Sequence, residues 1–304
     1  MRKVLITGAL GFIGRKLAEK FLNNGDAVIG WDIASGCCLG VDVCQVDLRD
    51  EKVVLEQLKK VKPDIIIHCA GSADVGKSVQ FPDEDYHGNV TVTHNLLFAL
   101  HKSKMTNVRF VFLSSAGVYG NPLVLPITED MPVNPLSPYA VHKVMCEELC
   151  RYFVKNYGID IKVARIFSAY GQGLKKQIFW DMYNKLKNIG CLEMFGTGNE
   201  SRDYIHVNDL TQAIYLIALS KTEEIFFNVA NGEEVTIREA TEMFARCAKL
   251  EAEKILFNGV VREGDPLNWR ADISKIRALG YRKSVEMCDG ILSYFQWVSG
   301  ENGS

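Results

Sequence analysis

The chain has 304 residues, of which 47% are hydrophobic and 24% charged, a composition that excludes general disorder, collagen-like repeats and coiled coils. Lysine and arginine number 35 against 37 aspartate and glutamate, and the resulting net charge of −2 argues against a nucleic-acid partner. This length suits one large α/β domain, or a nucleotide-binding domain with a smaller companion.

Three further features bear on the location of the protein. No apolar stretch approaches the roughly 20 residues of a membrane helix, so we expect no membrane partner. The segment 1–8 lacks the long apolar core and the cleavage site of a signal peptide, and we interpret it as the first strand. Nine cysteines form no CxxC pair and no His/Cys ligand cluster, which predicts reduced thiols, a cytoplasmic location and no metal site.

Apolar segments of strand length alternate with helical patterns along the first half of the chain. We expect strands at residues 4–7, 27–32, 43–46, 65–70 and 108–114, and helices at residues 12–23, 51–61, 90–102 and 138–156. The alternation predicts right-handed βαβ units, and therefore an α/β protein with a Rossmann-like, doubly wound parallel sheet.

After a strand-like segment at residues 159–166, glycine-rich loops interrupt this rhythm. We therefore expect one domain over residues 1–166 and a smaller C-terminal substrate-binding domain over residues 167–304. Some later segments, about residues 201–229, could return to the first domain.

A glycine triplet follows the first expected strand and opens the first expected helix. Gly8 permits the turn, Gly11 lets a pyrophosphate approach closely, and Gly14 lets helix and strand pack tightly. Asp32 ends the second strand 24 residues after Gly8, close to the spacing of the acid that binds an adenosine ribose diol. Its carboxylate would repel a 2′-phosphate, which favours NAD over NADP. An ordinary surface aspartate at a strand end is the alternative.

Two residues four positions apart lie on the helix expected at 138–156. Tyr139 and Lys143 project from the same face of that helix. A phenol with an ordinary pKa of about 10 is a poor base at neutral pH, and a nearby ammonium favours the phenolate. Ser115 closes the strand at 108–114, where an α/β sheet presents ligands, and could hydrogen-bond the same oxygen. A solvated helix pair and an ordinary turn serine are the alternatives.

In combination these motifs resemble the extended short-chain dehydrogenase/reductase family, specifically its NAD-dependent nucleotide-sugar epimerases and dehydratases of the UDP-galactose 4-epimerase type. The resemblance covers nearly the whole chain. The matching elements are TGALGFIG at 7–14, Asp32, HCAG at 68–71, VGKSV at 75–79, Asn89, SSAGVYG at 114–120, PYAVHK at 138–143, SRDYIHVNDL at 201–210 and REGD at 262–265.

The resemblance implies a role for each matching residue. The implied catalytic residues are Ser115, Tyr139 and Lys143. The implied NAD-binding residues are Gly8, Gly11, Phe12, Ile13, Gly14, Asp32, Asp47, Leu48, Ala70, Ser78, Asn89, Tyr139 and Lys143. The expected residues for a nucleotide-diphosphate sugar are Ser115, Ser168, Lys175, Arg202, Arg262, Asp265 and Trp269, since guanidinium groups suit a diphosphate.

Several of these residues also have simpler interpretations. Lys175 either recognises phosphate or stands at a solvated helix start, and Trp269 either contacts substrate or only packs. Either arginine alone could form a surface salt bridge. His68 and His142 belong to no metal spacing, and we interpret both as structural rather than as bases.

The departures from the family pattern narrow the function. Dehydratase relatives carry an Asp-Glu pair just after the catalytic residue, whereas this chain has Ala116-Gly117 and no acid for elimination there. UDP-galactose 4-epimerase-like members carry an asparagine where this chain has Ser168, and a lysine where it has Ala73. The nucleotide base and the sugar therefore stay open.

The expected function is that of an NAD-dependent nucleotide-sugar 4-epimerase acting through a 4-keto sugar. The alternatives are a nucleotide-sugar 4-dehydrogenase or 4-keto reductase, which would use the same residues, and a non-catalytic NAD-binding scaffold or sensor. The complete Ser115, Tyr139 and Lys143 set argues against a sensor. The resemblance also implies a homodimer through the helices near residues 90–102 and 138–156.

Overall fold

The computed structural model of the chain describes residues 1–38, 40–260 and 266–300. Its centre is an eight-stranded sheet in the order β12-β7-β6-β5-β1-β2-β4-β3. These strands are β1 (Lys3–Thr7), β2 (Ala27–Asp32), β3 (Gly36–Cys38), β4 (Val41–Gln45), β5 (Ile65–His68), β6 (Arg109–Ser115), β7 (Asp160–Ile166) and β12 (Phe226–Val229). The neighbouring strands are parallel, except that the short β3 pairs antiparallel with β4.

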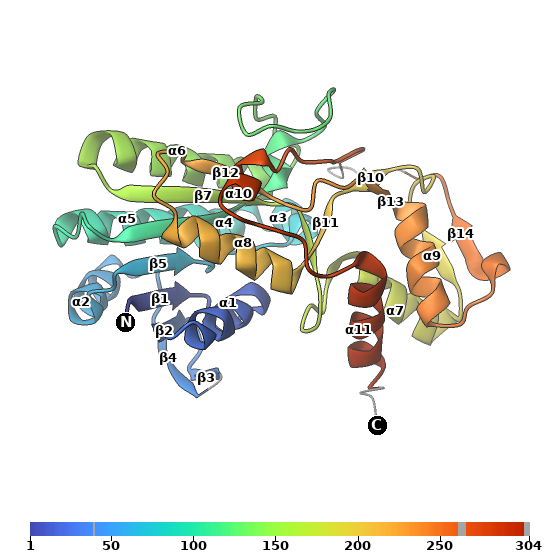
Figure 1. Cartoon of the computed structure of the whole chain (residues 1–304), viewed down its shortest axis with the longest axis horizontal. Coiled ribbons are helices and arrows are strands. Elements are labelled where there is room, and N and C mark those ends of the chain that lie inside the picture. Colours follow the sequence, from blue (N-terminus) through green and yellow to red (C-terminus); the bar gives the residue numbers. More distant parts are fainter. Residues whose placement is uncertain (39, 261–265, 301–304) are drawn as a thin grey trace.

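Helices cover both faces of the sheet (Figure 1). They are α1 (Phe12–Asn23), α2 (Glu51–Val61), α5 (Val92–Lys102), α6 (Pro138–Tyr157) and α8 (Val207–Leu219). On one face α1 and α8 bury Leu17, Phe21 and Ile214 against the strands. On the other face α2, α5 and α6 bury Leu58 and Leu97. Both cores form because the apolar residues of each helix recur on one side. The arrangement confirms the predicted doubly wound α/β fold.

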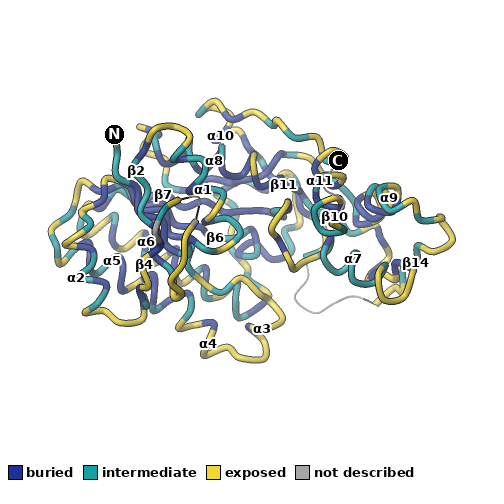
Figure 2. Tube along the Cα trace, turned by 90° about the horizontal axis from the view of Figure 1, so that it is seen from below, coloured by how far each residue is buried: buried dark blue, intermediate teal, exposed yellow. Residues whose placement is uncertain are grey.

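Much of the chain after β7 forms a smaller lobe beyond the carboxyl ends of the strands (Figure 1). Its helices are α7 (Gln177–Ile189), α9 (Ile237–Cys247) and α11 (Met287–Ser299), whereas α10 (Ser274–Ala278) packs on α8 and β12 of the first lobe. Its strands pair two by two: β8 (Ser168–Tyr170) with β11 (Tyr204–His206), β9 (Leu192–Met194) with β14 (Ile255–Phe257), and β10 (Ser201–Arg202) with β13 (Val235–Thr236). Phe179 of α7, Phe244 of α9 and Tyr294 of α11 form a third core. Figure 2 shows buried segments in both lobes and exposed turns around them.

The chain passes between the lobes more than once. After β7 it enters the smaller lobe, and it then returns through α8, which packs on α1, and β12, which pairs with β7. The division of the chain near residue 166 stays a prediction. Among the described residues, no helix is both long and apolar enough to cross a membrane.

The predicted elements of the first half are confirmed almost residue by residue. The main difference is at residues 90–102, where α5 begins at Val92 and is preceded by α3 (Val75–Gln80), α4 (Pro82–Tyr86) and a π-helical turn, His87–Thr91. A π-helical turn inserts an extra residue into the helix, and such insertions are frequent at functional sites.

Candidate active site

The glycine turn connects β1 to α1 at the carboxyl edge of the sheet. Gly8 has a φ of +66°, a conformation that residues with side chains rarely adopt. A side chain on Gly14 would overlap the Gly8 carbonyl oxygen, so α1 can approach the turn only because Gly14 has none. In the described part of the chain no side chain caps α1, so the amides of Phe12 and Ile13 are left for an anion.

Asp32 lies beside this turn because β2 is the neighbour of β1. Its Oδ2 accepts a hydrogen bond from the Leu10 backbone N–H at 3.0 Å, and its Oδ1 accepts one from the Ala34 N–H at 3.4 Å. The carboxylate is thus fixed against the glycine turn, in a position to accept hydrogen bonds from a ribose diol. The structure brings Asp32 and the turn together, and their cofactor contacts stay a prediction.

Asp47 and Leu48 follow β4, the next strand along the sheet. Arg49 binds the Asp47 carboxylate with its Nη2 2.6 Å from Oδ2, and this hydrogen bonding lowers the pKa of Asp47. Leu48 is buried, and its carbonyl accepts a hydrogen bond from Asn95 Nδ2 of α5 at 3.0 Å. An adenine amino group could bind Asp47 only by sharing its carboxylate with Arg49.

The loop after β5 faces the π-helical turn. Asn89 is 1% exposed, and its Oδ1 has no hydrogen-bond partner among the described residues. A side chain on Gly71 would lie 2.8 Å from this Oδ1 and 3.7 Å from Lys143 Nζ. A buried acceptor beside an ammonium and a side-chain-free gap is suited to a ligand hydroxyl. Together with the glycine turn, this environment fits a dinucleotide, with Ala70 in the same loop.

The start of α6 presents Tyr139. Ser137 caps the helix by accepting the Ala140 N–H, and Pro138 occupies the first helical position, so the sequence places the helix start here. Ser78 of α3 is fully buried, and its Oγ accepts the Tyr139 backbone N–H at 3.1 Å. Ser78 therefore fixes the Tyr139 backbone.

Lys143 lies one turn further along α6, as the four-residue spacing predicts. Its Nζ donates to the Leu113 carbonyl of β6 at 3.0 Å and lies 5.8 Å from the centre of the Tyr139 ring. Ser115 ends β6 two residues after Leu113, and its Oγ accepts the Gly117 N–H at 3.1 Å. Gly117 lies between Ser115 and the start of α6, since a side chain on it would be 3.3 Å from Ser115 Oγ and 3.6 Å from the Ala140 methyl.

A buried ion pair lies behind these residues. Arg165 of β7 and Glu147 of α6 are 1% and 2% exposed, and Arg165 Nη2 lies 2.7 Å from Glu147 Oε2. The Ser114 hydroxyl donates to Glu147 Oε1 at 2.6 Å, and Arg165 Nη1 donates to the Tyr119 hydroxyl at 2.9 Å. The pair therefore joins α6 to the end of β6. Sequence motifs did not point to it, because its members are 18 residues apart on different elements.

The two candidate histidines are both held by protein groups. His142 Nδ1 lies 2.7 Å from Oδ2 of the buried Asp85, which joins α6 to α4. His68 is 1% exposed, and burial together with the Lys143 charge lowers its pKa from 6.5 to about 3. With so low a pKa the His68 ring is neutral at physiological pH and does not serve as a cationic proton donor.

The depressed pKa of His68 makes stability depend on pH. The unfolded chain takes up a proton at this residue as the pH falls below about 6.5, whereas the folded chain does so only near pH 3. Stability from this group is therefore full above pH 6.5 and is lost between pH 6.5 and 3. We expect the difference in unfolding free energy between the wild type and His68→Gln to shrink by about 2 kcal/mol from pH 8 to pH 5. Urea unfolding at both pH values measures it, and a constant difference would contradict the assignment.

Arg202 and Trp269, two of the expected substrate residues, contact each other. Arg202 Cζ lies 5.7 Å from the centre of the Trp269 ring, and its Nη1 donates to the Leu267 carbonyl at 3.3 Å. Trp269 is 9% exposed and donates its Nε1–H to the Gly120 carbonyl, which supports packing as part of its role. The structure thus brings Arg202 and Trp269 together. Arg262 and Asp265 lie outside the described residues.

Ser168 lies on a strand, whereas Lys175 lies in the loop before α7. Ser168 begins β8 and pairs with Tyr204 of β11. Lys175 is exposed, with its Nζ 6.0 Å from the centre of the Trp297 ring on α11. Lys176, the next residue, donates instead to the Ala73 carbonyl of the first lobe at 3.1 Å. The two lysines of this segment therefore have different surroundings.

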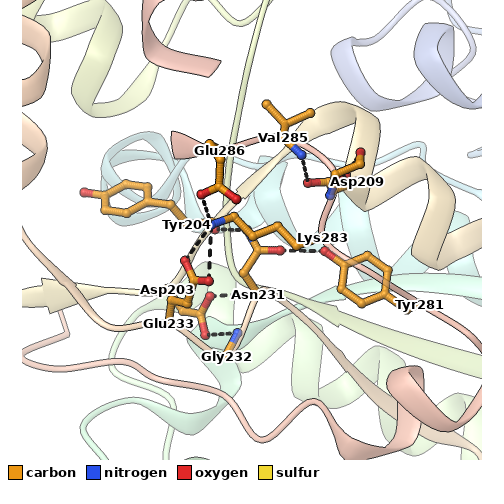
Figure 3. A network of polar contacts seen from close by, with 11 residues as sticks. Asp203, Tyr204, Asp209, Asn231, Gly232, Glu233, Tyr281, Lys283, Val285 and Glu286 are labelled. Atoms are coloured by element: carbon orange, nitrogen blue, oxygen red, sulfur yellow. Dashed lines mark hydrogen bonds and ion pairs between the residues drawn. The ribbon is translucent and has the colours of Figure 1, made fainter. Parts of the chain in front are cut away.

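Asp203 anchors the strand that carries Arg202 (Figure 3). Its carboxylate accepts backbone N–H groups from Asn231 at 2.9 Å, Gly232 at 2.9 Å and Ala271 at 3.0 Å. Burial nevertheless raises its pKa to about 7. Asn231 accepts the Tyr281 hydroxyl at 2.5 Å, which extends the network to the C-terminal segment. The sequence analysis identified the motif at 201–210 but not the structural role of Asp203, because the backbone groups that Asp203 binds are distant in sequence.

The surrounding contacts show how this network reaches α11. Lys283 lies 2.9 Å from Glu233 and 2.7 Å from Glu286, and Asp209 accepts the Val285 N–H at 3.1 Å (Figure 3). Across the residues that the structure describes, no three His, Cys, Asp or Glu side chains are grouped to hold a metal ion.

Comparison with known proteins bears on the function of this site. A model of the NAD dependent epimerase/dehydratase family matches residues 4–230. The chain is 31% identical to a putative UDP-glucose 4-epimerase of Methanocaldococcus jannaschii, over 98% of the chain and 99% of that protein. It is 31% identical to the UDP-glucose 4-epimerase of Lactobacillus helveticus, over 96% and 95% of the two chains.

A solved structure extends the similarity to the whole fold. The complex of Thermus thermophilus UDP-glucose 4-epimerase with NAD superposes with a TM-score of 0.87 at 28% identity, over 98% of this chain and 99% of that one. The match to the family model covers most of the first lobe, including α8 and β12. It therefore includes the glycine turn, Ser115, Tyr139 and Lys143. The chain belongs to the NAD-dependent epimerase/dehydratase family.

Proposed function

We propose that the protein is an NAD-dependent nucleotide-sugar 4-epimerase, which inverts sugar carbon 4 through a 4-keto sugar. The observation that carries this proposal is the placement of Ser115, Tyr139 and Lys143 at the carboxyl edge of the sheet that also holds the glycine turn. The relatives named above act on UDP-glucose according to their names, which makes UDP-sugars the first substrates to test.

The catalytic residues have distinct roles in this proposal. Tyr139, as phenolate, takes the proton of the sugar 4-hydroxyl and later returns it to the 4-keto oxygen. The Lys143 ammonium stabilises the phenolate, and Ser115 orients the hydroxyl. NAD, when bound by the glycine turn, Asp32 and the Asn89 environment, supplies the acceptor and donor of the carbon 4 hydrogen. Arg202 and Arg262 hold the diphosphate while the hexose turns over.

The residues after Ser115 favour epimerisation over elimination. Ala116 is fully buried in the first core, and Gly117 lies between Ser115 and α6. Neither can supply the acid that a dehydratase needs. A 4-dehydrogenase or 4-keto reductase would use the same three residues, but it would consume added cofactor in proportion to product.

The direct test incubates the purified protein with UDP-glucose, UDP-N-acetylglucosamine or UDP-glucuronic acid, with and without added NAD. The proposal predicts that ¹H NMR shows conversion of at least one sugar to its 4-epimer without added cofactor, and that mass spectrometry finds NAD released from the denatured protein. Oxidation of the sugar only in proportion to the NAD added would instead identify a dehydrogenase.

Asp32 should set the choice between NAD and NADP. We expect the nucleotide-free protein to prefer NAD by at least tenfold, about 1.4 kcal/mol, because the carboxylate repels a 2′-phosphate. Asp32→Ala should narrow this preference, chiefly by weakening NAD. Asp32→Asn is the control, since its amide oxygen can still accept the Leu10 N–H while the charge is lost. Calorimetric titration measures both affinities, and an unchanged preference would mean that another residue reads the ribose.

We also propose a homodimer through α5 and α6, which pack side by side. Val141 and Met145 lie one turn apart on α6 and are 41% and 44% exposed, so they offer an apolar surface for a second copy. Met145→Asp should give a monomer in light scattering. Leu292→Asp, at a 43% exposed residue of α11, is the matched control and should leave the dimer intact. A wild-type monomer would contradict the proposal.

The protein is further proposed to act in the cytoplasm. The eight cysteines that the structure describes are free thiols, and Cys146 and Cys150 are buried on α6. Such thiols persist in a reducing compartment. Fractionation of the native cells should find the protein with cytosolic markers, and recovery in another fraction would contradict this assignment.

A further inference from the structure

A buried hydrogen-bond chain connects the glycine turn to the π-helical turn. His68, at the end of β5, has Nδ1 2.7 Å from Thr7 Oγ1 and Nε2 3.1 Å from Thr93 Oγ1. Thr7 ends β1 immediately before the glycine turn, and its Oγ1 also accepts the Ala70 N–H at 3.2 Å. Thr93 Oγ1 donates to the Asn89 carbonyl at 2.7 Å. Thr7, His68, Asn89 and Thr93 are each at most 1% exposed.

The direction of each hydrogen bond follows from counting protons. The Asn89 carbonyl can only accept, so Thr93 commits its single hydroxyl proton to it. Thr93 must then accept from His68 Nε2, which therefore carries a proton. Burial and the Lys143 charge keep the ring from taking a second proton, so Nδ1 accepts from the Thr7 hydroxyl. Every polar atom of His68 and of the two threonine hydroxyls is thereby satisfied.

The hydrogen-bond chain ends at Asn89, whose side-chain oxygen lies beside Gly71. Asn89 Nδ2 donates to the Asp85 carbonyl at 3.1 Å, which leaves Oδ1 as the buried acceptor without a partner in the described residues. That oxygen and Lys143 Nζ both lie next to the space that a side chain on Gly71 would fill. The Asn89 carbonyl accepts the Thr93 hydroxyl and the Val92 N–H, and these two bonds hold the backbone from which the Asn89 side chain projects.

We propose that His68, as the Nε2–H tautomer, is a positioning residue that sets the distance between the end of β1 and the π-helical turn and so holds Asn89 Oδ1 toward the bound dinucleotide. This inference rests on the proposed NAD-dependent function. His68 touches neither cofactor nor substrate in this role. Its contribution is to keep the Thr7 end of β1 and the Asn89 backbone, on two sides of the proposed dinucleotide site, at a fixed distance from each other.

The matched test compares two buried threonines. Thr93 and Thr241 are 1% and 0% exposed, and each donates to the carbonyl four residues earlier, at 2.7 and 2.6 Å. Only Thr93 is also bonded to the ring nitrogen of a histidine. Thr93→Val and Thr241→Val therefore remove the same kind of local hydrogen bond, and Thr93→Val also removes the contacts of its hydroxyl with His68 and with the Cys146 thiol. His68→Gln, which leaves the Thr93–Cys146 contact in place, separates the two.

The measured quantity is the exchange rate of bound NAD against excess isotopically labelled NAD in the holoenzyme. We expect Thr93→Val to speed exchange about tenfold and Thr241→Val to leave it unchanged. His68→Gln should also speed exchange, and the double variant His68→Gln/Thr93→Val should be no faster than the faster single variant, because both break one chain. The pKa values read from the pH dependence of kcat should be the same in Thr93→Val as in the wild type, since His68 transfers no proton in the reaction.

A second measurement does not require a variant that folds. ¹⁵N NMR of the wild type should show the His68 ring as the neutral Nε2–H tautomer throughout pH 5 to 8. The inference is overturned if the ring is the Nδ1–H tautomer or titrates in that range, or if Thr93→Val exchanges NAD no faster than Thr241→Val. A wild type that holds no NAD would overturn the proposed function as well, whereas tight NAD binding with equal threonine variants would overturn only the role of His68.

Discussion

Replacing Tyr139 by phenylalanine should lower kcat at least about 10²-fold and leave nucleotide-sugar binding nearly unchanged. General-base catalysis typically contributes 10² to 10⁴-fold, and phenylalanine keeps the ring while removing the oxygen that takes the proton. Ser78 binds the Tyr139 backbone rather than the phenol, so the helix start should not shift. The loss should therefore be chemical and not structural.

Single-turnover reduction of bound NAD, followed by absorbance, measures this effect directly. Tyr152→Phe is the control, because Tyr152 is an exposed tyrosine of the same helix and should keep full activity. Arg202→Ala should behave oppositely to Tyr139→Phe, with weaker substrate binding from loss of a guanidinium partner for the diphosphate. A normal rate in Tyr139→Phe would exclude the tyrosine as base and direct attention to His142, whose Nδ1 contacts Asp85.

The second large effect concerns stability. Glu147→Gln should reduce the free energy of unfolding by about 3 to 5 kcal/mol, because it leaves the Arg165 guanidinium buried without a negative partner. The neighbouring residue is a matched control: Glu148 pairs with Arg151 at the surface, with 65% and 47% of the two side chains exposed. Glu148→Gln should therefore change stability by no more than about 0.5 kcal/mol. Denaturant unfolding measures both, and equal losses would contradict the importance of the buried pair.

Much of the first lobe was predictable because its signals are local. Each strand there is an apolar segment, and each helix repeats its apolar residues at three and four positions, so β1, α1, β5 and α6 could be placed from short windows of sequence. The site followed from topology, since the carboxyl ends of neighbouring parallel strands meet at one edge.

The smaller lobe was less predictable for the opposite reason. Strands such as β10 and β13 have two residues each, too few to show any alternation, and they exist because distant segments pair. Helix α7 begins at Gln177, two residues after Lys175, for which a helix start was one of two interpretations. The same limit applied to Asp203 and Glu147, whose partners lie on other elements.

Within the candidate site, spacing predicted neighbours better than it predicted partners. Tyr139 and Lys143 share a face of α6, as four-residue spacing requires. The contact between Asp47 and Arg49 was not anticipated, although Arg49 is only two residues away, because loop geometry decides whether they meet. His68 looked structural from sequence, but its two threonine partners come from β1 and α5 and could be identified only in three dimensions.

The most direct measurement of the central claim uses a nucleotide sugar that carries deuterium at carbon 4. An epimerase returns to the sugar the same hydrogen that it removed, so we predict that the 4-epimer keeps the deuterium at carbon 4 during turnover without added cofactor, as read by mass spectrometry and NMR. Product that has lost the deuterium, with the label recovered in reduced cofactor, would contradict the account and identify a one-direction oxidoreductase built on the same three residues.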